Sequence, residues 1–504
     1  MPLAIVFSRA LVGIDAPTVR VEVHLANGLP AISIVGLPEA AVKESKDRVR
    51  AAISNSGFDF PDRRITINLA PADLPKEGGR FDLPIALGIL AASNQIPADL
   101  LPAHEFIGEL SLAGELRPVT GALPSALATS KAQRTLILPT ENADEAALVE
   151  GLDLRPARQL LDVTQHLATG NTLPPYITEL AAAEPDYSID MADVRGQPKA
   201  RRALEVAAAG RHHMLMVGPP GTGKTMLATR LATIMPPMTD TEALESAAIL
   251  SIGQGGFDSS RYRQRPCRQP HHTSSGVALV GGGSIPRPGE VSLATHGILF
   301  LDEFTEFEKR VLEVLREPLE TGTITISRAA RQAEFPANFQ LIAAMNPCPQ
   351  GYDCDLRNNC QCTPEQQRRH RSRISAPILD RIDLQIEVPK LPREALRERA
   401  TDTEDSTAIR HRVTIARQRQ IERAGKPNAT LNNREVEKWC KLDAQSQALM
   451  DKAMDRFNLS ARAYHRILKV ARTIADLGEE QEISALHLTE ALGYRAMDRW
   501  MTGK

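Results

Sequence analysis

The stretch MLMVGPPGTGKTMLATRLATI, residues 214–234, decides the fold of the central part of the chain. Its first four residues are apolar and predict a buried strand, and Met226–Ile234 predicts a helix. Between them, GPPGTGKT fits the spacing G-x-x-x-x-G-K-[ST]. In such a loop, backbone N–H groups and a helix N-terminus surround phosphate groups. The sequence therefore predicts a nucleotide-binding P-loop made of Gly218, Pro219, Pro220, Gly221, Thr222, Gly223, Lys224 and Thr225.

Two further apolar runs supply the remaining groups of this site. The run ILFL at residues 298–301 ends in Asp302 and Glu303, and another run ends at Asn346. Asp302 is expected to hold Mg²⁺ with Thr225, and Glu303 to activate the attacking water as general base. Asn346 is placed to orient that water, although a turn-forming Asn before Pro347 is the alternative. The cofactors predicted are ATP and Mg²⁺.

Length, composition and charge exclude several classes of protein. At about 100–200 residues per domain, 504 residues predict roughly three domains. The 60 Lys and Arg against 62 Asp and Glu exclude a protein that coats nucleic acid by bulk charge. No stretch approaches the roughly 18 apolar residues of a membrane span, and the first apolar run has no charged segment before it. We expect a cytoplasmic protein with no membrane association.

The pattern predicts an α/β protein in several parts. Residues 1–170 alternate β-rich and helix-like runs and are expected to form a mixed α+β domain. A Pro pair breaks the pattern, so residues 171–189 are expected to be a linker. Residues 190–390 predict a parallel-sheet ATPase core. Residues 391–504 are helical, and Ser460 is expected to cap a helix that buries Ala463, Ile467, Val470, Ala471 and Ile474.

A long segment separates Lys224 from Asp302, which lie 78 residues apart. A simple crossover needs only about 30 residues, so an exposed functional insert is expected here. The insert holds the pair His271–His272. If the pair lies in a strand, the two side chains point to opposite faces, so we do not expect them to bind one metal ion.

Four cysteines, Cys348, Cys354, Cys360 and Cys362, lie within 15 residues directly after the Asn346 strand. Four thiolates on one loop can bind Zn²⁺ tetrahedrally and stabilise a segment that has no core of its own. The spacing differs from the usual C-x₂-C pairs, so reduced thiols without a metal are the alternative.

Clusters of arginine are candidates for contact with nucleic-acid phosphates. The insert carries Arg261, Arg263, Arg265 and Arg268, and Arg368, Arg369, Arg371 and Arg373 follow the cysteines. The segment TITISRAARQAEF predicts a hairpin with Arg328 and Arg331 at its turn, where they would track DNA in a ring pore. Solvated or subunit-interface charge is the alternative. Since few aromatic residues are available for stacking, we expect little sequence preference.

The motifs GPPGTGKT, LFLDE, AAMNP and ISAPILDRIDLQIEV resemble AAA+ ATPases of the helix-two-insert group. Together with RPCRQPHHTSSGVALVGGG and NPCPQG they resemble the ComM/YifB family over nearly the whole chain. The resemblance implies a homo-hexameric ATPase and DNA helicase that promotes branch migration of branched or forked DNA in natural transformation. The alternatives are a magnesium-chelatase-type remodeller acting on a protein partner, and an ATP-dependent switch with slow turnover.

The resemblance also implies roles for single residues. Arg381 in LDRID matches an arginine finger that reaches the ATP of the next subunit. Arg462 matches the sensor arginine of a C-terminal helical lid, with Arg466 as the competing choice, and Gln197 in DVRGQ belongs to the segment beside the adenine.

The first domain resembles the Lon protease fold through PKEGGRFDLPIALGIL and FIGELSLAGELRPVTGALPSALA. The position of the nucleophilic serine holds Arg80, and that of the lysine base falls at Pro124 or its neighbours. Without these groups peptide cleavage has no chemistry to use, so this Lon-protease-like domain is expected to be catalytically inactive.

Overall fold

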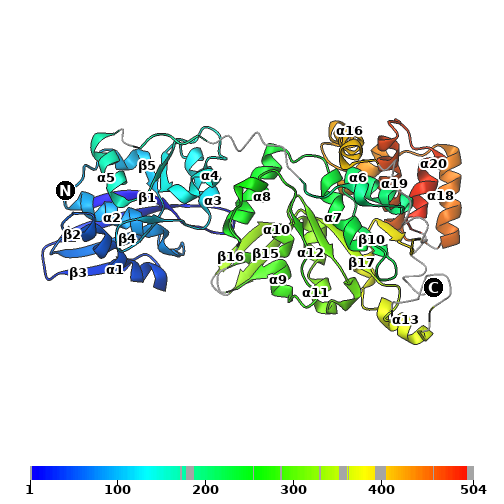
Figure 1. Ribbon diagram of the computed structural model, residues 1–504, viewed down its shortest axis with the longest axis horizontal. Helices are drawn as coiled ribbons and strands as arrows, with labels where there is room; N and C mark the ends of the chain where they lie inside the picture. The colour runs from blue at the N-terminus through cyan, green and yellow to red at the C-terminus, as the bar shows by residue number, and fades with distance from the viewer. Residues whose placement is uncertain are drawn as a thin grey trace. The chain divides into compact units, whose positions relative to one another are not determined.

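The computed structural model describes residues 3–170, 173–177, 187–253, 255–283, 286–328, 331–350, 360, 362–391, 404–457 and 459–495. The chain divides into two compact units, coloured along the chain in Figure 1. The first consists of Met1–Glu184 with Leu244–Tyr262, and the second of Pro185–Ala243 with Arg263–Lys504. Residues 244–262, which the sequence pattern groups with the ATPase core, thus belong to the N-terminal unit.

A seven-stranded mixed sheet forms the centre of the N-terminal unit. Its strand order is β3 (Ala31–Val35), β4 (Arg64–Ala70), β2 (Thr18–Ala26), β1 (Leu3–Arg9), β5 (His104–Phe106), β8 (Thr135–Pro139) and β9 (Leu154–Ala157). In β2, residues 19, 21, 23 and 25 are buried, as the alternation of apolar and polar residues requires. The first apolar run, which we assign to no element from the sequence, is strand β1, antiparallel to β2.

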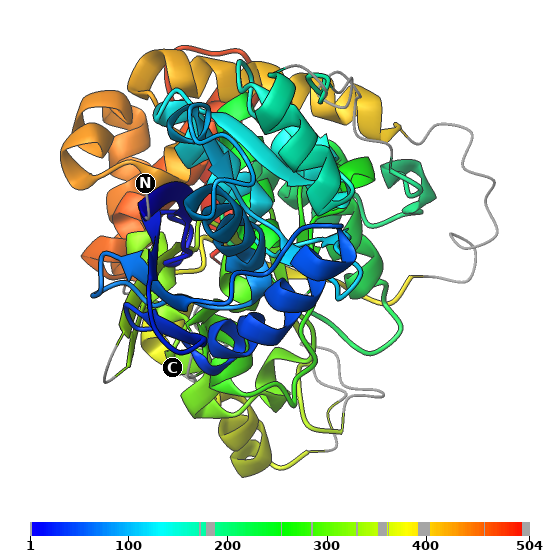
Figure 2. The same cartoon turned by 90° about the vertical axis from the view of Figure 1, so that its left-hand side faces the viewer.

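Helices α1 (Ala40–Asn55) and α2 (Asp82–Ala92) cover this sheet (Figures 1 and 2). Helix α2 is buried at every residue, and it approaches β2 closely because Gly88 has no side chain. A Cβ at Gly88 would lie 2.5 Å from Val23 Cγ2. The unit is completed by β6 (Glu109–Leu110), β7 (Leu116–Arg117), α3 (Ala122–Lys131), α4 (Ala143–Ala146) and α5 (Leu160–Thr169).

The second unit is built on a five-stranded sheet, whose paired strands are all parallel. Its order is β11 (Cys267–Arg268), β14 (Ile298–Leu301), β17 (Gln340–Met345), β10 (Met214–Val217) and β18 (Leu384–Glu387). Strands β10, β14 and β17 are fully buried. Helices α6 (Pro198–Gly210) and α7 (Lys224–Ile234) flank β10 in sequence. The predicted parallel sheet is confirmed, with the polar residues Asp302 and Asn346 directly after β14 and β17.

The segment between α7 and β14 forms several short elements, and others follow before β17. The former are α8 (Asp240–Ile252), α9 (Gly276–Val280), β12 (Gly281–Gly282), β13 (Arg287–Pro288) and α10 (Glu290–Leu293). The latter are α11 (Lys309–Glu313), α12 (Arg316–Thr321) and the predicted hairpin, which pairs β15 (Thr323–Arg328) with β16 (Arg331–Pro336). The side chains of Arg328 and Arg331 lie outside the described residues.

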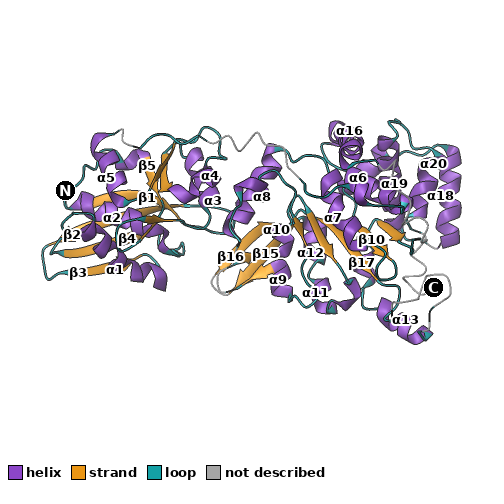
Figure 3. Ribbon diagram, in the orientation of Figure 1, coloured by secondary structure: helices purple, strands orange, loops and turns teal. Residues whose placement is uncertain are grey.

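The C-terminal part is helical, as Figure 3 shows in purple. Its helices are α16 (Ser406–Ala424), α17 (Asn433–Trp439), α18 (Ala444–Phe457), α19 (Ala461–Leu477) and α20 (Ala485–Gly493), with α13 (Pro364–Arg371) and α14 (Ala376–Leu379) before β18. The Ser460 side chain accepts a hydrogen bond from Ala463 N, and all five predicted apolar residues of α19 are buried. Four of them, Ile467, Val470, Ala471 and Ile474, share one hydrophobic core with the parallel sheet. No helix in the described part of the chain combines the length and the apolar character needed to cross a bilayer.

Candidate nucleotide site and thiol cluster

The P-loop connects β10 to α7 and leaves open space above its glycines. Gly221 and Gly223 adopt φ of 74° and 86°, values that favour glycine, and a Cβ on either would meet no atom within 4 Å. Gly218, in contrast, needs its missing side chain because a Cβ there would lie 2.2 Å from Val388 O. The loop therefore has the open backbone that a triphosphate requires.

The Lys224 ammonium group lies inside this loop. Its Nζ donates hydrogen bonds to Gly218 O at 2.7 Å, to Pro219 O at 2.9 Å and to Asn346 Oδ1 at 3.2 Å. Burial lowers the pKa of Lys224, and the charge of Asp302 opposes that shift. The Lys224 ammonium group thus lies inside the loop, and phosphate oxygens can replace the oxygen atoms to which it now donates.

Thr225 and Asp302 lie together at the end of the sheet. Thr225 Oγ1 donates to Asp302 Oδ2 at 2.7 Å. A hydroxyl and a carboxylate at this spacing form the hard oxygen set that Mg²⁺ prefers, and Mg²⁺ would supply charge neutralisation on the phosphates there. The residues present therefore fit the ATP and Mg²⁺ that were predicted.

Glu303 contacts a histidine of the insert. Its backbone is left-handed, with φ of 51°, and its exposed carboxylate Oε2 lies 2.9 Å from His272 Nδ1. His271 and His272 lie in a loop after β11 and not in a strand, and their ring centroids are 4.2 Å apart. The expectation that they point to opposite faces is therefore wrong, because it assumed an extended backbone.

Asn346 joins the P-loop to α13. Its side chain accepts from Lys224, and its backbone carbonyl lies 3.1 Å from Nε2 of buried His370 at the end of α13. Because a carbonyl only accepts, His370 Nε2 carries the hydrogen. Burial lowers the pKa of His370, which favours the neutral ring.

Gln197 lies at the start of α6 and is buried. Its Nε2 donates to Pro389 O at 2.7 Å, after the end of β18. The side chain thus connects α6 to the segment that follows the last strand of the sheet.

Arg381, Arg462 and Arg466 line one cavity of about 640 Å³. Among the described residues that line it, none belongs to the P-loop. Arg381 is 7% exposed, and it pairs with Glu320 and donates to Pro377 O at 2.5 Å. Burial, followed by the charges of Arg316, Arg466 and Arg462, lowers the pKa of Arg381. This cavity is a concentration of positive charge within the second unit.

The two candidate lid arginines differ in their contacts. Arg466 NH1 lies 2.6 Å from Oδ1 of buried Asp383, whereas Arg462 is 73% exposed and 3.8 Å from Asp380. Burial alone would raise the pKa of Asp383, but the charge of Arg466 and a hydrogen bond from His212 hold it below its usual range. Arg466 is therefore occupied by a buried carboxylate, while Arg462 reaches solvent.

The candidate DNA-binding arginines differ in their contacts: some are buried or paired with a carboxylate, and others are exposed. Arg265 is buried and donates to Pro236 O and His296 O, both at 2.6 Å, so this prediction of an exposed phosphate contact is wrong. Arg268 pairs with Glu290, and Arg373 with Glu306. Arg368 and Arg369 are exposed on α13, and neither forms an ion pair with a described residue.

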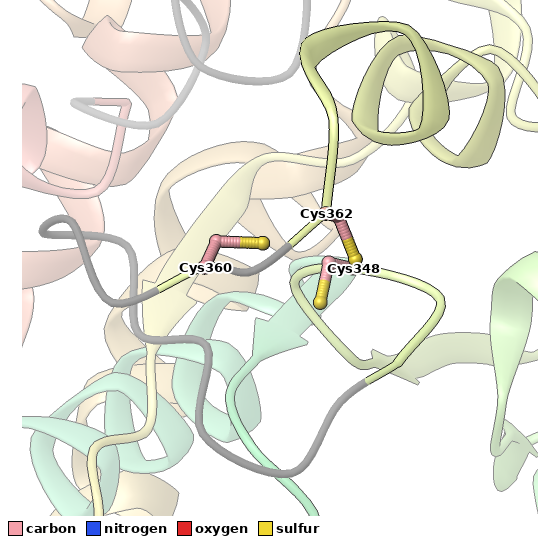
Figure 4. Close-up of side chains that lie close together, drawn as sticks. All are labelled: Cys348, Cys360 and Cys362. Atoms are coloured by element: carbon pink, nitrogen blue, oxygen red, sulfur yellow. The ribbon is translucent and has the colours of Figure 1, made fainter.

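Three of the four clustered cysteines lie together. The Sγ atoms of Cys348, Cys360 and Cys362 are all within 4.8 Å of one another, and Figure 4 shows the three side chains close together. None of the three forms a disulfide. Cys354 lies outside the described residues.

In the N-terminal unit, Arg80, which the Lon resemblance assigns to the nucleophile position, is buried. Its guanidinium donates to Arg9 O at 3.2 Å and also to Thr120 O, and burial lowers its pKa to about 10. Pro124 is buried in α3. Arg80 therefore joins backbone segments of the unit.

Comparison with known proteins agrees with this geometry. Residues 190–396 match the model of magnesium chelatase subunit ChlI, residues 21–142 that of subunit ChlI of Mg-chelatase, and residues 403–495 that of the ChlI C-terminal region. The chain is 53% identical to Competence protein ComM of Haemophilus influenzae over 503 residues, covering 99% of this chain and 98% of that protein. It belongs to the ComM/YifB family.

Two further proteins are similar to this ComM/YifB protein. It is 50% identical to protein YifB of Salmonella typhimurium over 500 residues, covering 99% of this chain and 98% of that protein. A shorter match of 193 residues, 25% identical, links it to Lon protease 2 of Bacillus subtilis, covering 33% of this chain and 34% of that protein. The chain is thus a magnesium-chelatase-like AAA+ ATPase with Lon-like similarity, and its family implies ATP and Mg²⁺.

Sequence reasoning missed three residues of the site. His272, His370 and Glu320 contact Glu303, Asn346 and Arg381 respectively. Each pair is distant in sequence, so only the fold brings its members together. The sequence analysis considered His272 only with His271, as a pair that could bind a metal, and no spacing signalled its contact with Glu303.

Proposed function

We propose that this protein is an ATP-driven DNA motor that assembles as a ring, a homo-hexamer, and promotes branch migration or unwinding of branched DNA during natural transformation in the cytoplasm. The identity to Competence protein ComM over almost the entire chain supports the biological setting. One observation carries the proposal. The P-loop and the arginine cavity lie in the same unit, but no described P-loop residue lines the cavity.

ATP hydrolysis would use the residues at the end of the parallel sheet. Lys224 exchanges its carbonyl partners for phosphate oxygens, and Thr225 with Asp302 holds Mg²⁺. Glu303 accepts the proton of the attacking water, and Asn346, already within reach of Lys224, positions that water. Gln197 supports the segment beside the base through Pro389.

The arginine cavity supports action between copies of the chain. Arg381 and Arg462 share a cavity that no described P-loop residue lines, so a triphosphate held there belongs to a second copy. Arg381 would leave Glu320 and bind the neighbour's γ-phosphate, and such a residue is worth about 10³–10⁵ in rate. Arg462 would contact the same nucleotide.

DNA contact is proposed for the exposed arginines of α13 and for the hairpin turn. Arg368 and Arg369 face solvent, while Arg328 and Arg331 lie at the turn between β15 and β16. Such contacts go to phosphates and carry little sequence preference. The Lon-like domain, with Arg80 in place of the nucleophile, would have no protease activity and would serve packing or assembly.

A second candidate is a chelatase-type remodeller that acts on a protein partner. The match of residues 190–396 to a magnesium chelatase subunit favours it. Both candidates hydrolyse ATP, so the response to DNA separates them.

The test is steady-state ATP hydrolysis with no DNA, single strands, duplex and a four-way junction. We expect stimulation that is largest with the junction, and loss of turnover by about a hundredfold or more in Lys224→Ala and Glu303→Gln. Glu303→Gln should keep ATP binding, because Lys224 and Thr225 remain. Turnover that ignores every DNA would replace the motor with the remodeller, and turnover that survives in Glu303→Gln would overturn the assignment of the base.

A further inference from the structure

Cys348, Cys360 and Cys362 form a thiol cluster that stands apart from the main hydrophobic core. Cys348 and Cys362 are buried and Cys360 is packed against them, and these cysteines make up a small core cluster of their own. Buried cysteines elsewhere usually pack among aliphatic side chains. Cys440 is such a residue, within the large core of the second unit. Among the residues that the structure describes, the three cysteines thus form this small cluster by themselves and do not belong to the large aliphatic core.

The spacing of the sulfur atoms fits a tetrahedral thiolate site. With Zn–S bonds of about 2.3 Å, tetrahedral ligands lie roughly 3.8 Å apart. The three Sγ atoms all lie within 4.8 Å, so small rotations of the side chains reach that arrangement. The described group consists of sulfur alone, and soft thiolates select Zn²⁺ over Mg²⁺. Thr225 and Asp302, at the end of the parallel sheet, offer oxygen atoms instead, which suit Mg²⁺.

The thiol cluster lies between Asn346 and α13. Cys348 follows Asn346 by two residues, and Cys362 directly precedes Thr363, which caps α13 with a reciprocal pair to Gln366. At the other end of α13, His370 contacts Asn346 O at 3.1 Å and Thr305 Oγ1 at 3.3 Å. Both ends of α13 thus return to the segments that carry Asn346 and Glu303.

We propose that Cys348, Cys360 and Cys362 bind one Zn²⁺ ion, and that this ion fixes the N-terminal end of α13 against the loop after Asn346. Three thiolates leave one position of the tetrahedron for a further ligand. With both ends held, displacement of exposed Arg368 and Arg369 by an anionic partner would be transmitted to the Asn346 carbonyl. This last consequence rests on the proposed role of Asn346 in hydrolysis; the metal site does not.

The first test measures metal content of the full chain purified under reducing conditions. We expect about one zinc per chain by plasma mass spectrometry, and less than a tenth of that in Cys348→Ser/Cys362→Ser. The matched control is Cys267→Ser, which changes an exposed cysteine outside the cluster. This variant should contain as much zinc as the wild type. Zinc absent from the wild type, equal zinc in all three proteins, or a disulfide among these cysteines in non-reducing peptide mapping would overturn the site.

Cobalt substitution gives a readout that does not depend on activity. After chelation and removal of the chelator, added Co²⁺ should give the visible bands of tetrahedral thiolate coordination in the wild type and in Cys267→Ser. The same bands in Cys348→Ser/Cys362→Ser, or none in any protein, would contradict the site.

The second test follows hydrogen exchange of α13 in the wild-type chain with and without Zn²⁺. We expect removal of the metal to speed exchange in α13 at least tenfold, with no change in α2 of the other unit, which guards against general unfolding. Unchanged exchange in α13 would refute the proposal that the ion fixes the N-terminal end of α13, even if zinc is bound. None of the three experiments uses DNA or ATP, so their failure is distinct from failure of the proposed motor.

Discussion

At the scale of single residues, the site is held in a resting arrangement by contacts that bound nucleotide would replace. Lys224 is bonded to carbonyls of its own loop, Glu303 to His272, and Arg381 to Glu320. Each contact satisfies a charge that would otherwise be partly desolvated. In the proposed mechanism, turnover requires that these contacts break.

We expect His272→Ala to raise ATP turnover without DNA. The His272–Glu303 contact restrains the carboxylate that we propose as the general base, and a hydrogen bond of about 1 kcal/mol corresponds to a change of about fivefold in population. The measurement is kcat without DNA beside His271→Ala, whose side chain contacts Thr273 instead. A rate that is unchanged or lower in His272→Ala would show that the contact does not restrain Glu303.

We expect Arg466→Ala to destabilise the second unit by about 3 kcal/mol at pH 7.5, because it leaves buried Asp383 without its strongest charge partner. Wild-type Asp383, with its pKa held low, contributes stability that is present above the unfolded pKa of about 4 and lost only below it. In the variant, burial favours protonated Asp383, so stability rises as pH falls from 7.5 to 5.

The difference in Tm between wild type and Arg466→Ala should therefore be smaller at pH 5 than at pH 7.5. Arg462→Ala is the control, with a cost below about 0.5 kcal/mol, since its pairing with Asp380 is long and exposed. Equal stability of Arg466→Ala and wild type at pH 7.5 would remove the structural role given to Arg466.

At the scale of elements, the insert and the loops after strands carry what distinguishes this chain from a bare P-loop core. The loop with His272 and α13 contact the end of the sheet where Asp302 and Asn346 lie, whereas the hairpin β15–β16 leads into the opposite end of β17. Strand ends of a parallel sheet are rigid, so short loops from them hold groups in register. Helix α13, which contacts the Asn346 carbonyl through His370, also carries exposed Arg368 and Arg369, neither of which forms an ion pair with a described residue.

We expect Arg368→Ala/Arg369→Ala to weaken DNA binding by about tenfold at moderate salt, with the DNA-free ATPase rate unchanged. Removal of two phosphate contacts should also lower the slope of log K against log salt by about 2. Binding is measured by fluorescence anisotropy across a salt series. Arg63→Ala/Arg64→Ala in the N-terminal unit, another adjacent exposed pair, is the control for net charge. Equal slopes in the two double variants would exclude α13 from the DNA contact.

At the scale of the whole molecule, the P-loop and the arginines that we propose to act on ATP lie at different sites of one chain. The P-loop and the arginine cavity are separate, although the lid and the sheet share a single hydrophobic core. A shared core makes large separation of lid and sheet costly, so a second copy is the simpler way to bring the arginines to a nucleotide.

We expect mixtures of Lys224→Ala and Arg381→Ala to recover ATPase activity that neither variant has alone. In a mixed ring, some interfaces combine an intact P-loop from one subunit with an intact Arg381 from another. At equal amounts and random assembly about a quarter of interfaces are intact, so about a quarter of wild-type activity is expected if they act independently. Activity no higher than the sum of the separate variants would argue that Arg381 acts within its own chain.

Local patterns in the sequence determined much of the fold and of the nucleotide site. The strand Met214–Val217, the hairpin at residues 323–336 and the buried face of α19 all occur as the residue pattern predicts, because period and capping are local properties. The positions of Asp302 and Asn346 followed from strand ends of a parallel sheet. The contact of Thr225 with Asp302 is the consequence.

Only the tertiary structure decided which charged side chains are buried or paired and which are exposed to solvent. Arg265 and Arg368 are equally basic in sequence, yet one is buried against carbonyls and the other faces solvent. The same holds for Arg466 and Arg462, for the contact of His272 with Glu303, and for the meeting of Cys348 with Cys360 and Cys362. The reason is physical: periodicity fixes the face on which a residue lies, whereas burial and pairing depend on segments that the fold brings from elsewhere in the chain.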